Sequence, residues 1–271
     1  VDVVKALLGH DGIAVNQATN SGFTPLYAAA QDGHVEVVKV LLAHDGIAVN
    51  QATNSGSTPL YAAAQDGYVE VVKVLLAHDG IAVNQARNSG FTPLFAAAGQ
   101  GHVEVVKVLL AHDGIAGNQA TNSGLTPLSF AAGEGHVEVV EVLLAHDGIA
   151  VNQAMDDGRT PLFGAAMEGH VDVVKALLGH DGITVNQATN SGLTPLSFAA
   201  GEGHVEVVEV LLAHDGIAVN QAMDTGGTPL SVAAWQGHVE VVKALLGHDG
   251  IAVNQAMDTG ATPLFAAAEE G

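Results

Sequence analysis

The chain has 271 residues, of which 48% are hydrophobic and only 4% aromatic, so its core must be built from small and branched side chains. Its formal net charge of −21 repels nucleic acids and anionic lipids, which proteins bind through Lys and Arg, and it favours a cationic partner. The absence of Cys excludes disulfides and thiolate chemistry, and no apolar run is long enough to span a membrane.

A repeat of 34 residues organises the whole sequence. Thr-Pro-Leu recurs without insertion or deletion at Thr24, Thr58, Thr92, Thr126, Thr160, Thr194, Thr228 and Thr262. Repeats of this period indicate a solenoid, in which each unit packs only on its two neighbours. We therefore expect one domain over residues 1–271, made of a half repeat 1–18, full repeats 19–52, 53–86, 87–120, 121–154, 155–188, 189–222 and 223–256, and a half repeat 257–271.

Each repeat begins with a short predicted helix. In the repeat 19–52, Thr24 is a suitable N-cap, and Pro25 fits the first helical position because its missing N–H has no partner there. The helix is expected over Leu26–Gln31, and Gly33 is expected to end it with a positive φ. The three Ala residues of this segment allow neighbouring helices to approach closely.

A second helix is predicted over Val35–Leu42. Its Val content is also compatible with a strand, but the polar Glu36 and Lys39, followed by the small Ala43, form one narrow stripe at helical spacing. A helix that is apolar on its other sides needs neighbours there, and a stacked array supplies them. After the Asp-Gly break, Ile47–Asn50 is expected to be extended and Asn54–Gly56 to form a turn, giving a short β-hairpin-like finger.

These motifs resemble the ankyrin repeat, at Thr24-Pro25-Leu26, Ala29-Ala30, Gly33-His34, Val37-Val38, Leu41-Leu42 and Val49-Asn50 and their copies. The resemblance covers the whole chain and implies an all-α ankyrin-repeat solenoid. Tetratricopeptide arrays share the period, but their Trp, Tyr and Phe positions are absent here.

The sequence departs from the family pattern in three ways. The family's usual Asp at the start of the unit is replaced, and each unit is one residue longer than the usual 33, with the extra residue in 43–46. The His that follows Thr-Pro-Leu in the family, where it helps to tie adjacent repeats, is also replaced. Its place is taken by Tyr27, Tyr61, Phe95, Ser129, Phe163, Ser197, Ser231 and Phe265. Some hydrogen bonding between repeats is therefore expected to be lost.

The repeats are near-copies that differ mainly in the fingers and on the first helix. In ankyrin-type stacks these parts line the concave groove that usually binds partners, so the resemblance implies a groove with aromatic anchors and an acidic rim. The candidate groove residues are Phe23, Tyr27, Asp32, Tyr61, Arg87, Phe91, Phe95, Arg159, Phe163 and Trp235. The alternative is that exposed positions drift and that some aromatics fill space left by the missing His.

Fourteen His residues invite a metal hypothesis, but repeats stacked ~10 Å apart cannot share one zinc ion, whose ligands lie ~2 Å from it. We expect structural roles for the His residues and helix termination for the Asp-Gly pairs. The sequence contains no arrangement of nucleophile, base and orienting group. We therefore expect no metal, no cofactor and no catalysis.

Gly117 replaces the Val found at Val49 and Val83. Losing a buried Val there is expected to cost ~1–3 kcal/mol. The sequence therefore predicts that the loop near Gly114–Asn118 is the softest part of the array.

The favoured function is a non-catalytic scaffold that presents an acidic concave groove to a cationic protein partner, with no nucleic acid and no membrane involved. The alternative is a structural protein that assembles head to tail into filaments, because its ends are expected to leave apolar side chains bare. The candidate assembly residues are Val1, Val4, Leu8, Leu264 and Phe265. The sequence leaves the compartment undetermined and favours an intracellular location.

Overall fold

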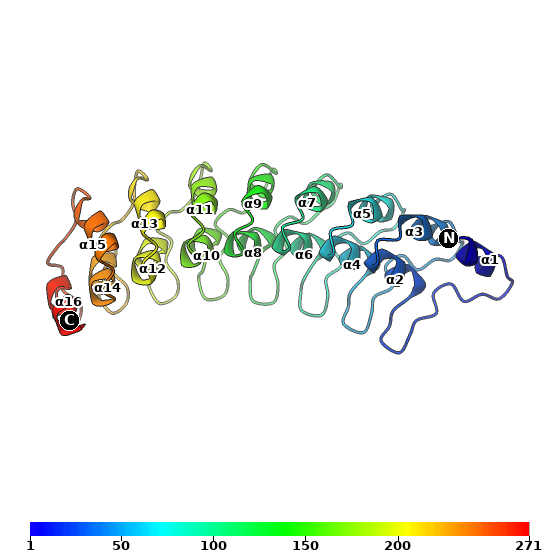
Figure 1. Ribbon diagram of the computed structural model, residues 1–271, viewed down its shortest axis with the longest axis horizontal. Helices are drawn as coiled ribbons and strands as arrows, with labels where there is room; N and C mark the ends of the chain where they lie inside the picture. Colours follow the sequence, from blue (N-terminus) through cyan, green and yellow to red (C-terminus); the bar gives the residue numbers. More distant parts are fainter. Residues whose placement is uncertain (271) are drawn as a thin grey trace. The chain divides into compact units, whose positions relative to one another are not determined.

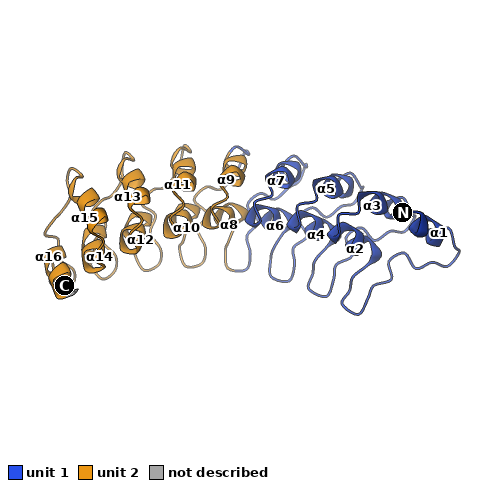
Figure 2. Cartoon of the chain, in the orientation of Figure 1, with its two compact units in different colours: residues 1–122, 145–149 blue, residues 123–144, 150–271 orange. Residues whose placement is uncertain are grey.

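The computed structural model describes residues 1–270, with side chains up to Glu269, and contains only helices, turns and loops in that range (Figure 1). The chain divides into two compact units (Figure 2). Unit 1 comprises residues 1–122 and 145–149, and unit 2 comprises residues 123–144 and 150–271.

Unit 1 contains seven of the helices, α1 (Asp2–Leu8), α2 (Pro25–Gln31), α3 (Val35–Leu42), α4 (Pro59–Gln65), α5 (Val69–Leu76), α6 (Pro93–Gly99) and α7 (Val103–Leu110). Unit 2 contains α8 (Pro127–Gly133), α9 (Val137–Leu144), α10 (Pro161–Met167), α11 (Val171–Leu178), α12 (Pro195–Glu202), α13 (Val205–Leu212), α14 (Pro229–Trp235), α15 (Val239–Leu246) and α16 (Pro263–Glu270). None of the helices in the described part of the chain is long and apolar enough to cross a membrane.

Two rows of helices run through each unit. In unit 1 the first helices α2, α4 and α6 pack in sequence, and the second helices α3, α5 and α7 pack beside them; unit 2 repeats the arrangement with α8 to α16. The Val segments are therefore helices, as the polar stripe predicted. This is an ankyrin-type solenoid fold, in which each repeat is buried by its neighbours.

The first helices begin as the sequence predicts. The Oγ1 atom of Thr24 accepts a hydrogen bond from the backbone N–H of Tyr27 at 3.1 Å, and Pro25 occupies the first turn. Gly33 follows the helix with φ +70°, a conformation that favours Gly. Where the motif carries Ser in place of the family's His, the hydroxyl supports its own helix, since Thr194 N–H donates to Ser197 Oγ at 2.8 Å.

The second helices carry their polar stripe in solvent. In α3 the ammonium group of Lys39 lies 2.6 Å from Glu36 Oε1, and α5, α7, α11 and α15 contain the equivalent pair. Glu141 and Glu209 replace this Lys in α9 and α13. Each exposed pair contributes only a few tenths of a kcal/mol, so burial of the opposite side supplies the stability.

The core consists of small and branched side chains, as the composition predicts. The Leu after each Pro from Leu26 to Leu230 is at most 3% exposed, and the Val pairs from Val71-Val72 to Val207-Val208 are at most 1% exposed. Ala29 and Ala30 and their copies lie between successive first helices, where only a small side chain fits.

The segment after the second helix differs from the sequence prediction. Residues 47–50 are not extended throughout, because Val49 and Asn50 form a turn closed by a hydrogen bond from Gln51 N–H to Ala48 O at 3.1 Å. The second helix ends at Leu42, so the extra residue of the repeat lengthens the loop rather than the helix. The fingers are hairpin-like, with Thr53 N–H donating to Ser57 O at 2.9 Å.

Neighbouring repeats are joined by an Asn that sequence analysis did not single out. The side chain of Asn50 donates to Gly80 O at 2.8 Å and accepts from Ala82 N–H at 2.9 Å, and Asn16, Asn84, Asn186 and Asn220 make the same pair of bonds. Each Asn thus bridges two repeats and supplies cross-repeat hydrogen bonds that the missing motif His does not.

Candidate binding surface

The candidate surface is the finger–helix face, which we define as the side chains of the fingers and of the last turn of each first helix. In unit 2 these two parts line common hollows, as shown by Met155 and Arg159 of one finger beside Gly133 of α8. The fingers hang below the first helices in Figure 1. This is the surface on which the repeats differ most in sequence.

Four of the aromatic residues expected as groove anchors are core residues instead. Tyr27, Tyr61, Phe95 and Phe163 are buried, because the position after Thr-Pro-Leu points between neighbouring repeats. The expectation that these side chains offer contact surface is therefore wrong. Their burial agrees with the alternative, in which the rings fill the space left by the missing motif His. Burial raises the pKa of Tyr27 above 10.0, against smaller opposing effects of hydrogen bonding to Ser57 and of the charge on Arg87.

Two other aromatic residues are more accessible. Phe23 is 39% exposed and Trp235 is 49% exposed, whereas Phe91 is half-buried. Phe23 rests on Tyr27 with ring centroids 4.7 Å apart, and Phe91 stacks on Phe95 at 4.5 Å. In unit 1 the partly exposed rings of Phe23 and Phe91 therefore each pack against a buried ring.

The two Arg residues of the face are already engaged. The guanidinium carbon of Arg87 lies 5.1 Å from the centroid of the Tyr61 ring, a cation–π arrangement. Arg159 Nε donates to Asp157 Oδ2 at 2.6 Å. Neither Arg therefore presents an isolated positive charge to a partner.

In each unit an acidic ridge follows the carboxyl ends of the first helices. Its exposed members are Asp32 and Asp66 in unit 1 and Glu134, Glu168 and Glu202 in unit 2. A carboxylate at this end of a helix meets the negative end of the helix dipole, so helix stability does not explain its presence.

Asp66 shows the electrostatic cost of this arrangement. Desolvation raises the pKa of the Asp66 carboxyl above 3.8; the charge of Asp32 on the preceding repeat adds to this effect, and His102 opposes it. Burial of the carboxylate, more than repulsion from Asp32, therefore disfavours its charged form.

Four His residues make hydrogen bonds between repeats. His102 Nε2 donates to Gln65 O at 2.9 Å, and His170, His204 and His238 donate to the equivalent carbonyls of their preceding repeats. These bonds also tie adjacent repeats together. Within residues 1–270, no group of three or more His, Asp or Glu side chains is placed to hold a metal ion.

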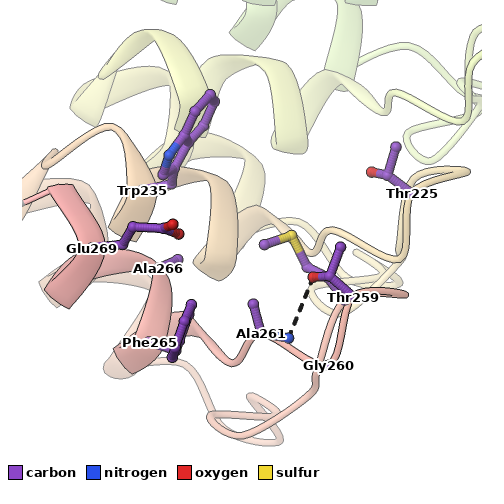
Figure 3. A pocket seen from close by; sticks show the side chains of 9 residues that line it. Thr225, Trp235, Thr259, Gly260, Ala261, Phe265, Ala266 and Glu269 are labelled. Carbon is purple, nitrogen blue, oxygen red and sulfur yellow. Dashed lines mark hydrogen bonds between the residues drawn. The ribbon is translucent and has the colours of Figure 1, made fainter.

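Two hollows open on the finger–helix face of unit 2, and neither follows from the sequence pattern alone. The first, of about 510 Å³, lies between α8 and α10 and includes Gly133, Gly164, Met155 and Met167. The second, of about 570 Å³, lies between α14 and α16 and includes Trp235, Met257, Phe265 and Glu269 (Figure 3).

The stacked helix pairs and their variable outer face define a helical-repeat protein. The family model described as ankyrin repeats (3 copies) matches residues 1–87, 81–155, 114–189, 147–223, 185–257 and 217–271. The chain belongs to the ankyrin-repeat family, whose members are generally protein–protein interaction modules.

A solved structure agrees with this assignment. The chain is similar to the human ASB11 ankyrin repeat domain, with 33% sequence identity and a TM-score of 0.73. The comparison covers 84% of this chain and 99% of that domain. No curated protein matches the chain.

Proposed function

We propose that this protein is a non-catalytic scaffold that binds a cationic protein partner on its finger–helix face. The acidic ridge carries the proposal, because it places carboxylates where helix dipoles disfavour them, on the most variable surface of the repeats. Phe23 and Trp235 supply accessible aromatic contacts on the same face, with Phe91 partly accessible. Interfaces commonly combine such aromatic anchors with a polar rim.

Affinity capture from a native lysate tests this proposal with two variants of equal charge. The face variant carries Asp32→Asn, Asp66→Asn, Glu134→Gln, Glu168→Gln and Glu202→Gln. The control removes five acids from the second helices, through Glu104→Gln, Glu138→Gln, Glu141→Gln, Glu206→Gln and Glu209→Gln.

We expect the unmodified chain and the control to retain the same basic protein and the face variant to lose it. Trp235→Ala with Phe23→Ala and Phe91→Ala, made in the unmodified chain, is also expected to weaken retention. Equal retention by the face variant and the control would show that this surface is not the binding site.

A second candidate function is head-to-tail self-association. Leu264 on α16 is 79% exposed, although its counterparts from Leu26 to Leu230 are at most 3% exposed. At the other end Val3 is 73% exposed, whereas its counterparts from Val71 to Val241 are buried. Docking α16 of one molecule beside α1 of the next would bury both surfaces in the way that a repeat buries its neighbour.

The exposed end residues differ in part from those chosen from sequence. Val1, Leu264 and Phe265 are exposed, but Val4 and Leu8 are half-buried, and Val3 and Leu7 present more surface than either. An apolar hollow of about 160 Å³ lies beside α1 and includes Val4, Leu7 and Leu8.

Light scattering across a concentration series tests this second candidate. We expect the apparent mass to increase with concentration and the increase to disappear in Val3→Glu and in Leu264→Glu, since each change places a charge in the buried contact. A constant monomer mass at all concentrations would eliminate self-association.

A further inference from the structure

The two hollows of unit 2 occupy the same position in two different repeats. Gly133, Met155 and Gly164 of the first hollow correspond to Trp235, Met257 and Ala266 of the second, each three repeats later in the chain. Phe130 and Met167 also line the first hollow.

Missing side chains create the first hollow. A Cβ atom placed on Gly133 would meet nothing within 4 Å, and one on Gly164 would come no closer than 3.9 Å to Gly133. The two glycines thus form an open floor between α8 and α10, flanked by Phe130, Met155 and Met167. The carboxylates of Glu134 and Glu168 lie at its edge, and both residues are exposed.

Aromatic rings and a carboxylate surround the second hollow. Figure 3 shows Trp235 on α14 and Phe265 and Glu269 on α16 along adjoining helices, opposite the finger that carries Thr259. Trp and Phe faces attract cations, and a nearby carboxylate strengthens that attraction. Both hollows therefore combine an apolar lining with negative charge.

Side chains fill the positions between the two hollows. Phe198 takes the place that Gly164 has in the preceding repeat and packs edge-on against Phe163, with ring centroids 5.2 Å apart. At the next position, Val232 Cγ1 lies 2.9 Å from where a Cβ on Gly201 would be, so that space is also occupied. Unit 2 thus offers two separate sites rather than one continuous channel.

The chemistry of the lining selects the occupant. An apolar floor accepts an aliphatic stem, and carboxylates or aromatic faces accept the positive charge at its end, which is the structure of a Lys or Arg side chain. Arg159 also lines the first hollow, with Nη1 4.0 Å from Met167 Sδ and Nε bound to Asp157 Oδ2 at 2.6 Å. The Arg159–Asp157 pair carries no net charge, so Glu134 and Glu168 leave the hollow net negative. An acidic or purely aliphatic side chain would lack this match.

The repeat spacing fixes the distance between the sites. Packed helices lie ~10 Å apart, so three repeats separate the hollows by ~30 Å. We infer that unit 2 binds one basic protein segment at two points, through two Lys or Arg side chains ~30 Å apart that enter these hollows. This inference rests on the proposed function and specifies its partner.

Rigid peptide rulers test the spacing. Acetylated peptides with one Lys at each end of a polyproline segment hold their ends ~3.1 Å apart per residue, so about nine prolines give the required span. Peptides with about three, nine and fifteen prolines are titrated at low salt and pH 8. Trp235, the single Trp of the chain, reports occupation of the second hollow through its fluorescence.

We expect the peptide with about nine prolines to bind at least ~10-fold more tightly than the shorter and longer ones, because only it engages both hollows. Replacing both terminal Lys residues with norleucine or Glu is expected to abolish binding. Equal affinity at all lengths, or no binding at any length, would overturn the inference.

Gly133→Gln supplies a variant that closes the first hollow without threatening the fold. Gln31 and Gln65 occupy the equivalent position in other repeats, and Gly is less favourable than Gln in a helix. We expect this variant to lose the length optimum while keeping weak binding at Trp235. Glu141→Gln with Glu209→Gln, on the second helices, is the control and is expected to keep the optimum.

The outcomes separate this inference from the proposed function. Loss of the natural partner by the face variant, together with length-independent ruler binding, would retain the proposed function and reject the two-point mode. Retention of the partner by the face variant would reject the proposed function whatever the rulers show.

Discussion

At the scale of single residues, two glycines that replace larger side chains have different effects. Gly133 leaves a hollow on the finger–helix face, at the first of the two proposed contact points. Gly117 removes a side chain from a position that is buried Val in most repeats, and it leaves a hollow of about 350 Å³ that also includes Ile115 and Ile149. The same residue type therefore leaves a hollow on the finger–helix face at one position and beside a loop between repeats at the other.

Gly117→Val is expected to stabilise unit 1 by ~1–2 kcal/mol, because it restores buried apolar area and restricts the unfolded chain. The backbone of Gly117 does not require positive φ, and its new Cβ would meet only the movable end of Ile149 at 3.0 Å. Urea unfolding measures the change, and amide hydrogen exchange is expected to slow over residues 114–118.

Val83→Gly is the matched control for this substitution, and it is expected to destabilise the protein by ~1–3 kcal/mol. An unchanged urea midpoint in Gly117→Val, or exchange that is uniform across all repeats in the unmodified chain, would contradict a soft segment at Gly117.

Asp66→Asn is expected to stabilise the protein slightly at neutral pH. The pKa of Asp66 is raised by desolvation and then by Asp32, so the folded state holds the proton more tightly than the unfolded state does. The Asp66 carboxyl group therefore does not destabilise the folded state below pH ~3.8, where it is protonated in both states. Its destabilising effect develops as pH rises from the unfolded-state pKa to the higher folded-state pKa of Asp66, and it stays constant at higher pH.

Because Asp66 is exposed, this gain should be on the order of a few tenths of a kcal/mol. Thermal unfolding of the variant and the unmodified chain at pH 3 and pH 7 measures the difference. A gain that is larger at pH 3 than at pH 7 would be inconsistent with this role of the carboxylate.

At the scale of the elements, short helices become stable only through their neighbours. The helices contain seven or eight residues each, fewer than an isolated helix needs in water. Thr caps and glycine ends define their limits. Asn side chains such as that of Asn50 bond to the next repeat, and His side chains such as that of His102 bond to the preceding one. The finger tips are equally constrained, since Gly56 has φ +85° and a Cβ there would lie 2.8 Å from Asn88 N.

Asn84→Ala is expected to destabilise the protein by ~1–3 kcal/mol, because it leaves Ala116 N–H and Gly114 O without their side-chain partner. Hydrogen exchange at Ala116 is expected to accelerate in the variant. Asn84→Asp keeps the acceptor and loses the donor, so an intermediate cost is expected. Wild-type stability of Asn84→Ala would show that water replaces the bridge at no cost.

At the scale of the whole molecule, negative charge opposes the compact state. The formal charge of −21 would decrease to −7 if all 14 His were protonated. We expect added salt to raise the thermal midpoint at pH 7 and to raise it less at pH 5, where self-repulsion is smaller.

Differential scanning calorimetry at two salt concentrations and both pH values measures this effect. Glu141→Lys with Glu209→Lys reduces the negative charge and restores the Lys of the other repeats, so it is expected to reduce the salt dependence at pH 7. A salt effect of the same size at both pH values would argue against repulsion as its cause.

The repeat pattern predicted the helices and the family correctly because the relevant signals are local. Thr-Pro starts a helix, Gly ends it, and the polar stripe of the second helix distinguishes helix from strand within eight residues. The same local reasoning was wrong for Val49 and Asn50, because the turn there is coupled to contacts with the adjoining repeat.

The candidate site was predicted only in part. The sequence indicated which positions vary and that the variable face is acidic, but it did not separate exposed aromatics such as Trp235 from buried ones such as Phe95. That separation depends on whether a neighbouring repeat covers the ring.

The sequence by itself determined the repeat, the helix limits, the small-residue core and the negative charge of this protein, since each follows from residues close together in the chain. Only the tertiary structure decided which side chains are buried, how Asn and His join the repeats, and where hollows open. Those features arise between residues about one repeat apart, such as Gly133 and Gly164, and packing alone brings them together.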